Sequence, residues 1–378
     1  MAVYKIFPTQ DATLYSYYPA MNTGLDAICE VSNQLNILVA GETPMVARYL
    51  TQFSTEEIQN TINDKIGNNE FDVYLKNFIS EAQGLNQTNK LEIHPIAQPW
   101  NNGTGHYLDT PEVDDGCSWG FRLSSGSGTW SMSGNEGIYV YTGSFNPLYS
   151  IQGGGSWFTS SALIPEVTES FSLRSEKDIE LNVKSITKLW YSSSISNNGF
   201  IVKLSGSAEF NTSKYFQPIL KYYSVDTNTI YPPQLEFRWR DYTSSIDPSS
   251  DLIVTTSDIK LSLSENPQEF NQNAVNRFHI NVSPLYPERV FQTSSLYTSL
   301  NYLPTASYYA VKDLDTNEFV INFDTQYTQI SSDSVGNYFD IYMNGLEPER
   351  YYSILVKTEI NGSTLIIDDD NYFKVING

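Results

Sequence analysis

Short stretches in which hydrophobic and polar residues alternate recur along the chain, separated by residues that favour turns. Residues 234–242 read QLEFRWRDY, with apolar residues at Leu235, Phe237 and Trp239 and charged residues between them. A strand with this period of two would bury one face and present a charged one to solvent. GFIVKLSG (199–206) alternates in the same way, as does RFHINVSPLY further on. These patterns predict a protein built from β-strands.

One segment has helical periodicity instead. STEEIQNTINDKIG (54–67) begins with Ser54 and has Glu57 three residues later, which is the arrangement of a capping box. Isoleucine recurs at every fourth position from Ile58 to Ile66, and a glycine follows where a helix would end. We therefore predict one short helix here in an otherwise all-β protein, covering one end or face of a β-sandwich.

Turn-forming residues also divide the chain into regions. Between residues 101 and 165, NNGTG, SSGSG, SGNEG and IQGGGSWF separate single aromatic residues, which predicts long Gly/Ser-rich loops. DYTSSIDPSSDL (241–252) is polar, contains proline and follows a well-patterned strand. This composition predicts a boundary between two β-sandwich domains, residues 1–242 and residues 243–378.

The composition strengthens the β prediction and excludes several partners. Aromatic residues make up 14% of the chain, with 27 Tyr and 19 Phe, and such residues favour strands. The formal net charge is −21, with 22 basic residues against 43 acidic ones, which argues against nucleic acid and against an anionic membrane surface. A high net charge of one sign does keep a tyrosine-rich protein soluble at the concentrations reached in a large assembly.

The cysteine content and the first residues indicate the cellular compartment in which the chain is made. Cys29 and Cys117 are the only cysteines, too few for a domain held by disulfides, and whether they form one bridge is left open. The opening MAVYKIFPTQ has no apolar core of a signal peptide, and no run approaches the ~18 apolar residues of a membrane span. We expect a chain made in a cytoplasm, without membrane insertion.

The order of signals from residue 1 to residue 242 resembles the DNRLRE-type domain, a jelly-roll β-sandwich family that includes carbohydrate-binding modules. The family's opening D-A-x-L…N-x-G-x-D pattern is matched by DATLYSYYPAMNTGLDAICEVS (11–32). Further matches are MVARYLTQFS (45–54), KLEIHPIAQPW (90–100), KSITKLWYSSSISNNGFIVKLSG (184–206, through Thr187, Trp190, Asn198, Gly199 and Phe200) and PPQLEFRWRDY (232–242). The resemblance implies a jelly roll for this region, and the predicted helix and long loops depart from the family's compact pattern.

The last third of the chain resembles the E–F corner of a fibronectin type III or immunoglobulin-like sandwich. In YFDIYMNGLEPERYYSILV (338–356), Leu346 ends a strand, Pro348 follows two residues later and Tyr352 opens the next strand. The resemblance implies that the ring of this tyrosine packs inside while its hydroxyl bonds back to the chain upstream. Asn361 with its following glycine is the preferred two-residue type I′ hairpin turn.

No motif indicates catalysis or a resident metal. HPIAQPWNNGTGHY (94–107) contains His94 and His106, but the short ligand spacings of a zinc site are missing, so we interpret this stretch as a surface strand running into a turn. The chain lacks a G-x-S-x-G nucleophile elbow, and nothing singles out a pair of carboxylates for glycoside hydrolysis. We predict no catalytic residue, no metal ligand and no cofactor, and leave open a structural calcium at 109–116 or 367–371.

Aromatic residues in the long loops are the remaining candidates for function. The aromatic side chains and their polar neighbours could stack on a sugar, anchor another protein, or simply pack at the loop bases. The candidate contact residues are Trp100, Asn101, His106, Tyr107, Trp119 and Trp157, and Trp130 shares the same three interpretations.

The MAVYKIFPTQDA opening and the Tyr/Asn/Ser-rich texture resemble structural proteins of tailed bacteriophages. The resemblance implies a non-enzymatic virion component of the tail, baseplate, neck or capsid decoration, contacting other virion proteins or further copies of itself. A carbohydrate-binding module for host adhesion, on a particle or a cell surface, is the second hypothesis. A polysaccharide-acting enzyme ranks third.

Overall fold

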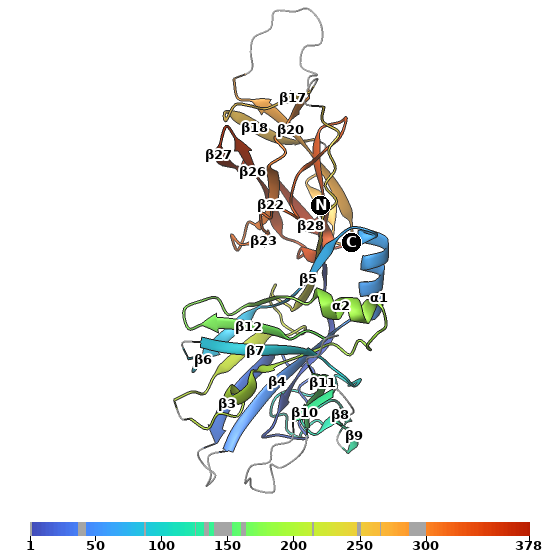
Figure 1. Cartoon of the computed structure of the whole chain (residues 1–378), viewed down its shortest axis with the longest axis vertical. Coiled ribbons are helices and arrows are strands. Elements are labelled where there is room, and N and C mark those ends of the chain that lie inside the picture. Colours follow the sequence, from blue (N-terminus) through green and yellow to red (C-terminus); the bar gives the residue numbers. More distant parts are fainter. Residues whose placement is uncertain are drawn as a thin grey trace, which may run out of the picture. The chain divides into compact units, whose positions relative to one another are not determined.

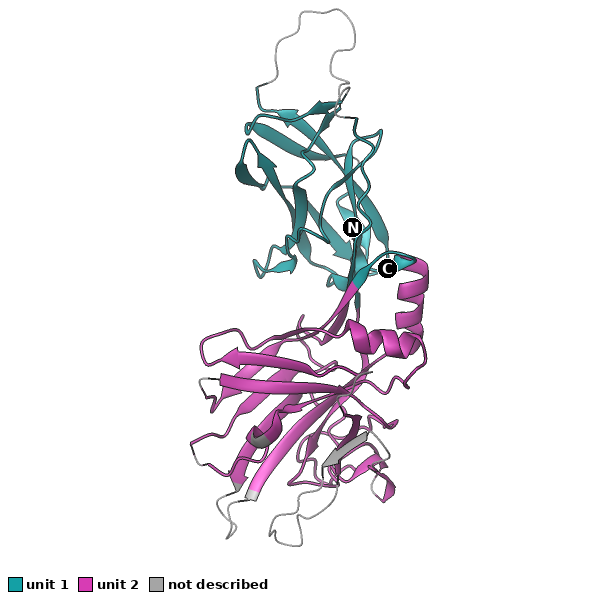
Figure 2. Cartoon of the chain, viewed as in Figure 1, with its two compact units in different colours: residues 1–5, 66–71, 237–378 teal, residues 6–65, 72–236 magenta. Residues whose placement is uncertain are grey.

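The computed structural model of the protein describes residues 2–36, 43–86, 88–124, 126–131, 136–139, 153–159, 164–213, 215–247, 251–264, 266–286 and 300–378. The chain forms two compact units (Figure 2): unit 1 comprises residues 1–5, 66–71 and 237–378, and unit 2 comprises residues 6–65 and 72–236. The main division therefore falls between residues 236 and 237, where the sequence predicted 242 and 243. The two short segments of unit 1 that precede residue 72 were not predicted.

Unit 2 is built on an eight-stranded sheet in which every pairing is antiparallel (Figure 1). The strand order is β12-β7-β14-β4-β3-β15-β6, and β2 pairs with β4. The strands are β2 (Pro8–Tyr15), β3 (Ile28–Asn36), β4 (Thr43–Phe53), β6 (Ile79–Gln83), β7 (Thr88–Pro95), β12 (Val167–Ser172), β14 (Phe200–Leu204) and β15 (Ile219–Tyr223).

The region predicted as long loops contains short strands as well. Here β8 (Phe121–Ser124) pairs with β9 (Ser127–Thr129), and β10 (Glu136–Tyr139) pairs with β11 (Gly153–Phe158). The prediction of irregular structure from 101 to 165 was therefore wrong for these segments, because glycine-rich strands look like turns in the sequence. Residues 125, 132–135, 140–152 and 160–163 of this region lie outside the described residues.

Two helices are present among the described residues, although the sequence predicted one. The predicted helix is α1 (Thr55–Asn60), continued by the π-helix η1 (Thr61–Ile66), and the Ser54 side chain caps it by accepting a hydrogen bond from the Glu57 N–H at 3.2 Å. The second is α2 (Lys184–Tyr191), which lies beside α1 in Figure 1. α2 is only eight residues long and has no side-chain N-cap, so the sequence offers neither the length nor the start signal that would predict a helix.

A further sheet has the strand order β1-β16-β5-β13. Its strands are β1 (Ala2–Ile6), β5 (Phe71–Asn77), β13 (Ile179–Asn182) and β16 (Gln234–Trp239). Leu235, Phe237 and Trp239 of β16 are buried as predicted, but Glu236 between them is also buried and pairs with Lys76 at 3.4 Å. Lys203 on β14 is buried in the same way, so these strands are covered on both faces and the expected charged solvent face was wrong.

Unit 1 has a β-sandwich core formed by side chains from two sheets. One sheet has the order β18-β20-β25-β24, and the other β19-β28-β26-β22-β23 with β27 paired to β26. The strands are β17 (Leu252–Ile253), β18 (Ile259–Ser264), β19 (Glu269–Asn271), β20 (Val275–Pro284), β21 (Asn301–Tyr302), β22 (Ser307–Asp313), β23 (Phe319–Ile321), β24 (Ser331–Ser332), β25 (Asn337–Tyr342), β26 (Tyr351–Ile360), β27 (Ser363–Ile367) and β28 (Tyr372–Ile376). Single-turn 3₁₀ helices occur at Gly206–Ala208 in unit 2 and at Met343–Gly345 in unit 1.

Two local predictions for unit 1 are confirmed. Tyr352 is 1% exposed, and its hydroxyl donates a hydrogen bond to the Glu347 carbonyl, 2.9 Å away, so the ring packs inside and the hydroxyl holds the chain upstream. Asn361 and Gly362 both have positive φ, 53° and 74°, and connect β26 to β27 in a two-residue hairpin. The all-β fold class predicted from the sequence is thereby confirmed, with sheets in both units.

Candidate ligand-binding site

Three of the predicted contact residues lie in the core of unit 2. Trp100, Trp119 and Trp157 are only 6%, 4% and 8% exposed, and they pack in one hydrophobic cluster with Trp130. The Trp100 indole N–H donates to the Asn198 carbonyl at 2.8 Å, so its polar edge is also satisfied internally. Of the three interpretations left open for these tryptophans, packing at the loop bases is the one that the structure shows, and their rings pack against apolar residues of the large sheet.

The three other candidates lie on the loop that follows β7. Asn101 is exposed, and its side-chain amide donates to the Asp115 carbonyl at 3.1 Å. His106 is exposed, with its Nδ1 atom 3.6 Å from an Asp109 carboxylate oxygen. Tyr107 is 47% exposed, and it is the one predicted contact residue that lines the pocket described next.

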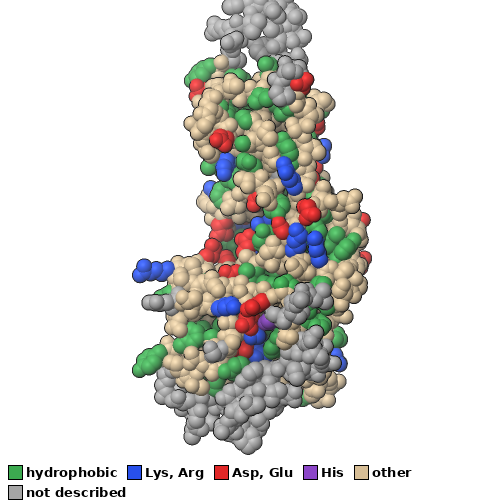
Figure 3. Space-filling view, in the orientation of Figure 1, with side chains coloured by type: hydrophobic (Ala, Val, Ile, Leu, Met, Phe, Trp, Pro, Cys, Tyr) green, Lys and Arg blue, Asp and Glu red, His purple; other side chains and the backbone are tan. Residues whose placement is uncertain are grey.

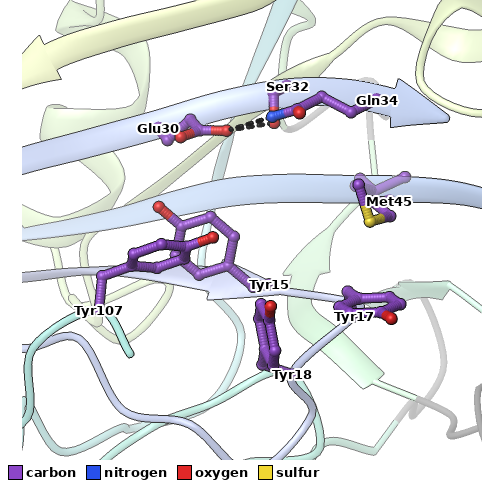
Figure 4. A pocket seen from close by; sticks show the side chains of 9 residues that line it. Tyr15, Tyr17, Tyr18, Glu30, Ser32, Gln34, Met45 and Tyr107 are labelled. Atoms are coloured by element: carbon purple, nitrogen blue, oxygen red, sulfur yellow. Dashed lines mark hydrogen bonds between the residues drawn. The ribbon is translucent and has the colours of Figure 1, made fainter. Parts of the chain in front are cut away.

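A pocket with about 430 Å³ of empty space, partly open to solvent, lies where β2, β3 and β4 meet this loop (Figure 4). We call it the tyrosine pocket. Figure 4 shows aromatic rings on one side and a row of polar side chains from β3 on the other. Its lining residues are Tyr15, Tyr17, Tyr18, Glu30, Ser32, Gln34, Met45, Val46 and Tyr107.

The N-x-G-x-D motif holds Tyr107 in place. Asn22 is fully buried, and its side-chain amide donates to the Asn102 carbonyl at 2.6 Å while its oxygen accepts the Gly105 N–H at 2.8 Å. A Cβ on Gly24 would lie 2.2 Å from the Asn102 carbonyl oxygen, so only glycine fits this approach. Asp26 then accepts the Tyr107 N–H at 3.0 Å. These contacts fix the loop, and with it the tyrosine, against the strand that precedes the motif.

The other tyrosines come from the end of β2 and the turn after it. Ser16 anchors this turn to Val46 on β4 through two hydrogen bonds, one from its N–H at 2.9 Å and one to its hydroxyl at 2.8 Å. The Tyr15 and Tyr107 ring centroids are 4.9 Å apart, and Tyr18 meets the Tyr107 ring edge to face at 6.1 Å. Because each ring packs on the next, the aromatic wall is already formed without a ligand.

The polar wall is one face of β3. Glu30, Ser32 and Gln34 occupy alternate positions and therefore project to the same side of the sheet. One carboxylate oxygen of Glu30 accepts the Ser32 hydroxyl at 2.5 Å and the Gln34 amide at 3.4 Å (Figure 4). These bonds set the direction of the Glu30 carboxylate toward the pocket.

Burial and nearby acidic charge raise the pKa of two phenol groups of the pocket, those of Tyr15 and Tyr107. Burial raises the pKa of Tyr15 well above its ordinary value, and the Glu30 charge adds to this effect. Burial likewise raises the pKa of Tyr107, with Tyr18, Glu30 and Asp26 contributing. The pocket therefore offers hydroxyl donors and aromatic faces beside a carboxylate.

The lining residues suit recognition better than bond cleavage. Glu30 is the one acidic residue among them, whereas glycoside hydrolysis normally uses two carboxylates flanking the bond. Histidine and cysteine do not occur in the lining, so it holds no general base of that kind for a nucleophile. Aromatic faces next to hydrogen-bonding side chains are the surfaces on which polar ring-shaped ligands stack.

A second group of charged side chains lies inside unit 2. Arg48 is fully buried, bonds through two nitrogens to the Glu209 carboxylate at 2.6 and 3.0 Å, and packs between the rings of Trp119 and Trp157. His94 was predicted on the surface but is only 7% exposed, because its ring stacks on Trp157 at 6.0 Å. These groups are shielded by core packing, and we interpret them as structural.

Cysteine thiols and the carboxylates of acidic loops are common metal ligands. Cys29 and Cys117 are both free and buried, and burial raises the pKa of each thiol. Within the described ranges, no three His, Cys, Asp or Glu side chains come together as metal ligands. In the 109–116 loop, Asp115 accepts hydrogen bonds from the Thr104 N–H and hydroxyl, at 2.8 and 2.7 Å. This carboxylate thus stabilises the loop directly.

Surface charge and helix length bear on the predictions about nucleic acid and membranes. On the face drawn in Figure 3, basic side chains are scattered among acidic ones, without a continuous basic stripe. In the part of the chain that is described, no helix has the length and apolarity needed to cross a membrane.

Most of the pocket was missed from the sequence. Two stretches of the sequence signalled it. LYSYYP (14–19) places three tyrosines within four residues at the end of a strand, and EVSNQ (30–34) places polar residues at alternate positions. Neither pattern shows that the two stretches adjoin the loop of Tyr107, since that depends on the Asn22 contacts.

Comparisons with known proteins identify no family. No protein-family model matches the chain, and no curated protein matches it. Among solved structures, the chain is similar to a DUF4785 family protein from Legionella pneumophila, with 9% identity and a TM-score of 0.17. That alignment covers 98% of this chain and 65% of the other, so the chain spans about two-thirds of that protein's length. A likeness this weak carries no conclusion about fold or function.

Proposed function

We propose that this protein is a non-enzymatic carbohydrate-binding protein and that the tyrosine pocket of unit 2 is its binding site. The observation that carries the proposal is the pocket itself, in which four tyrosine rings face a row of polar side chains from β3. Sugars present apolar ring faces together with hydroxyl groups, and this pocket offers a partner for each. The resemblance of residues 1–242 to a family that includes carbohydrate-binding modules agrees with the proposal.

The pocket also meets the energetic requirement for weak but specific binding. Its aromatic wall is held by ring packing and by the Asn22 contacts, so little conformational entropy is lost when a ligand enters. Among the residues that line the pocket, the hydroxyls of Tyr15, Tyr18 and Tyr107 form no hydrogen bond with one another or with the polar wall (Figure 4), which leaves them available to a ligand.

Glycan-array binding of the purified chain tests this proposal. Tyr18→Ala removes one ring of the aromatic wall. It should reduce binding to the recognised glycan at least tenfold, a loss of about 1.4 kcal/mol or more. Tyr215→Ala is the matched control, because Tyr215 is 98% exposed, lies in the same unit and lines no part of the pocket. Absence of saturable binding to any glycan, or an equal loss in both variants, would reject the proposal.

The second candidate is a structural role in a tailed-phage particle, and the two roles are compatible. It is favoured by the resemblance of the opening residues, by the net charge of −21 and by the apolar side chains that unit 1 exposes. Val275, Val335 and Ile366 are 52%, 60% and 61% exposed, and side chains of this kind are common in protein–protein interfaces. Each unit would then have its own task, assembly for unit 1 and adhesion for unit 2.

Quantitative mass spectrometry of purified particles tests this second role. A fixed ratio to the major capsid protein would support it, and the ratio would separate a capsid decoration protein from a tail, neck or baseplate component. Absence of the chain from washed particles would reject it while leaving the binding proposal intact.

A further inference from the structure

Glu30 is an acidic side chain on the polar wall of the tyrosine pocket, and it has no salt-bridge partner among the described residues. It is only 9% exposed, and its two hydrogen bonds, from Ser32 and Gln34, both go to the same oxygen. A carboxylate removed from water in this way is normally paired with a cation or fully hydrogen-bonded, because an uncompensated buried charge is costly.

The charge of Glu30 acts on Lys221, but Lys221 forms its ion pair with a different carboxylate. Lys221 on β15 lies directly opposite Glu30 in the sheet register, but its ammonium group is 2.6 Å from a Glu81 carboxylate oxygen on the next strand. None of the nine lining residues is a lysine or an arginine. Asp26, behind Tyr107, adds a second acidic group near the pocket. The local field therefore favours a positive group and disfavours a negative one.

The aromatic wall also favours a positively charged group. The face of a tyrosine ring attracts a cation electrostatically, and several rings around one carboxylate form a setting in which an ammonium group is well stabilised. Tyr15, Tyr17, Tyr18 and Tyr107 all line the pocket together with Glu30. Figure 4 shows these rings and the carboxylate around one common space.

We propose that the tyrosine pocket selects a sugar that carries a protonated amine, with Glu30 as the counter-ion of the ammonium group and the tyrosine rings as its aromatic surround. This inference rests on the carbohydrate-binding function proposed above and specifies its substrate class. Sugars with carboxylate or sulfate groups are excluded, because their charge would face Glu30. Neutral sugars lose the ion pair and bind more weakly.

The test compares three small ligands that differ at one position of the ring: methyl glucosaminide, methyl N-acetylglucosaminide and methyl glucoside. Ligand-observed NMR titration of the full chain measures each affinity at 150 mM salt, so that attraction to the protein's overall negative charge is screened. We expect the free amine to bind about tenfold or more tightly than either neutral sugar, the size of effect typical of a charge-assisted hydrogen bond.

Two variants locate the effect. Glu30→Gln keeps the shape of the side chain and removes the charge, and it should abolish the preference for the amine, so that the amine and the neutral sugars bind with similar affinities. Glu56→Gln makes the same change of charge on the exposed helix α1 and should leave the preference intact. Thermal unfolding of both variants checks that the fold is retained.

The outcomes separate this inference from the proposed function. If the neutral sugars bind as tightly as the amine, or if Glu30→Gln keeps the preference, the inference is overturned and carbohydrate binding stands. If Tyr18→Ala leaves every affinity unchanged, or none of the sugars binds, the pocket is not a sugar site and both fail.

Discussion

Asp11 makes the stability of unit 2 depend on pH in a direction opposite to that of most carboxylates. It lies on β2, is 2% exposed and accepts the Val225 N–H at 2.7 Å, with Asp226 and Asp26 nearby. Burial, assisted by these two acidic neighbours, raises the pKa of Asp11 from its ordinary 3.8 to about 7. The folded protein therefore holds a proton that the unfolded chain releases above pH 4.

The sign and size of the effect follow from proton linkage. Because the folded state binds more protons than the unfolded state between pH 4 and pH 7, the free energy of unfolding falls as the pH rises through this range. A difference of about three pKa units corresponds to about 4 kcal/mol, at about 1.4 kcal/mol per unit. The contribution is fully present below pH 4 and lost above pH 7.

Asp11→Asn isolates this contribution, since the amide has the same shape, can still accept the Val225 N–H and does not ionise. We expect the variant to match the wild type near pH 4 and to be more stable by about 4 kcal/mol at pH 8. Urea unfolding at several pH values, followed by tryptophan fluorescence, measures the difference. Five of the six tryptophans belong to unit 2, which makes this signal specific to it.

Subtracting the wild-type curve of unfolding free energy against pH from that of Asp11→Asn removes the contributions of all other titrating groups. Asp64→Asn, at an exposed position of η1, is the control and should give a flat difference across the range. A flat difference for Asp11→Asn as well, or a variant that is less stable at pH 8, would show that folding does not raise the pKa of this carboxyl and would refute the reasoning.

Three further predictions concern stability and the loop. Glu209→Gln leaves the Arg48 charge buried without its partner, so we expect a loss of about 3–5 kcal/mol in urea unfolding, far more than an exposed ion pair would cost. Gly24→Ala places a methyl group against a backbone oxygen, and it should displace the loop of Tyr107 and weaken glycan binding in the array assay, with a lower melting temperature. Tyr352→Phe removes one hydrogen bond at the corner of unit 1 and should cost about 1 kcal/mol by denaturant titration, with the fold kept.

Local features of the fold were predictable wherever a few neighbouring residues determine the conformation. The Ser54 cap, the Asn361 hairpin and the Tyr352 corner each depend on contacts within about five residues, and all three are present. The burial of strand residues was less predictable. Glu236 and Lys203 alternate with apolar residues, which is the pattern of residues that face solvent, yet both are buried. Their burial depends on neighbouring strands that supply partners, which the sequence pattern does not contain.

The candidate site was also hard to predict, because it depends on contacts between residues that are far apart in the sequence. Tyr107 was predicted as a contact residue, but the tryptophans predicted with it are core residues, since aromatic residues in loops serve both purposes. Tyr15 and Glu30 are 15 residues apart in sequence, and the pocket needs both of them beside a loop some 80 residues further on. That proximity is created by Asn22, a single buried amide whose long-range hydrogen bonds leave no periodic trace.

The composition of unit 1 has a consequence for synthesis of the chain. Its residues 1–5 and 66–71 leave the ribosome well before residues 237–378, which make up the rest of the unit. At about 5–20 residues per second, the two early segments wait roughly 10–50 s for the first residues of their partners, and by then the residues of unit 2 are complete. Unit 1 is thus the last part of the molecule to close. A chain cut short before β28 would leave β19 and part of the β26 edge unpaired, and unpaired strand edges are prone to aggregation.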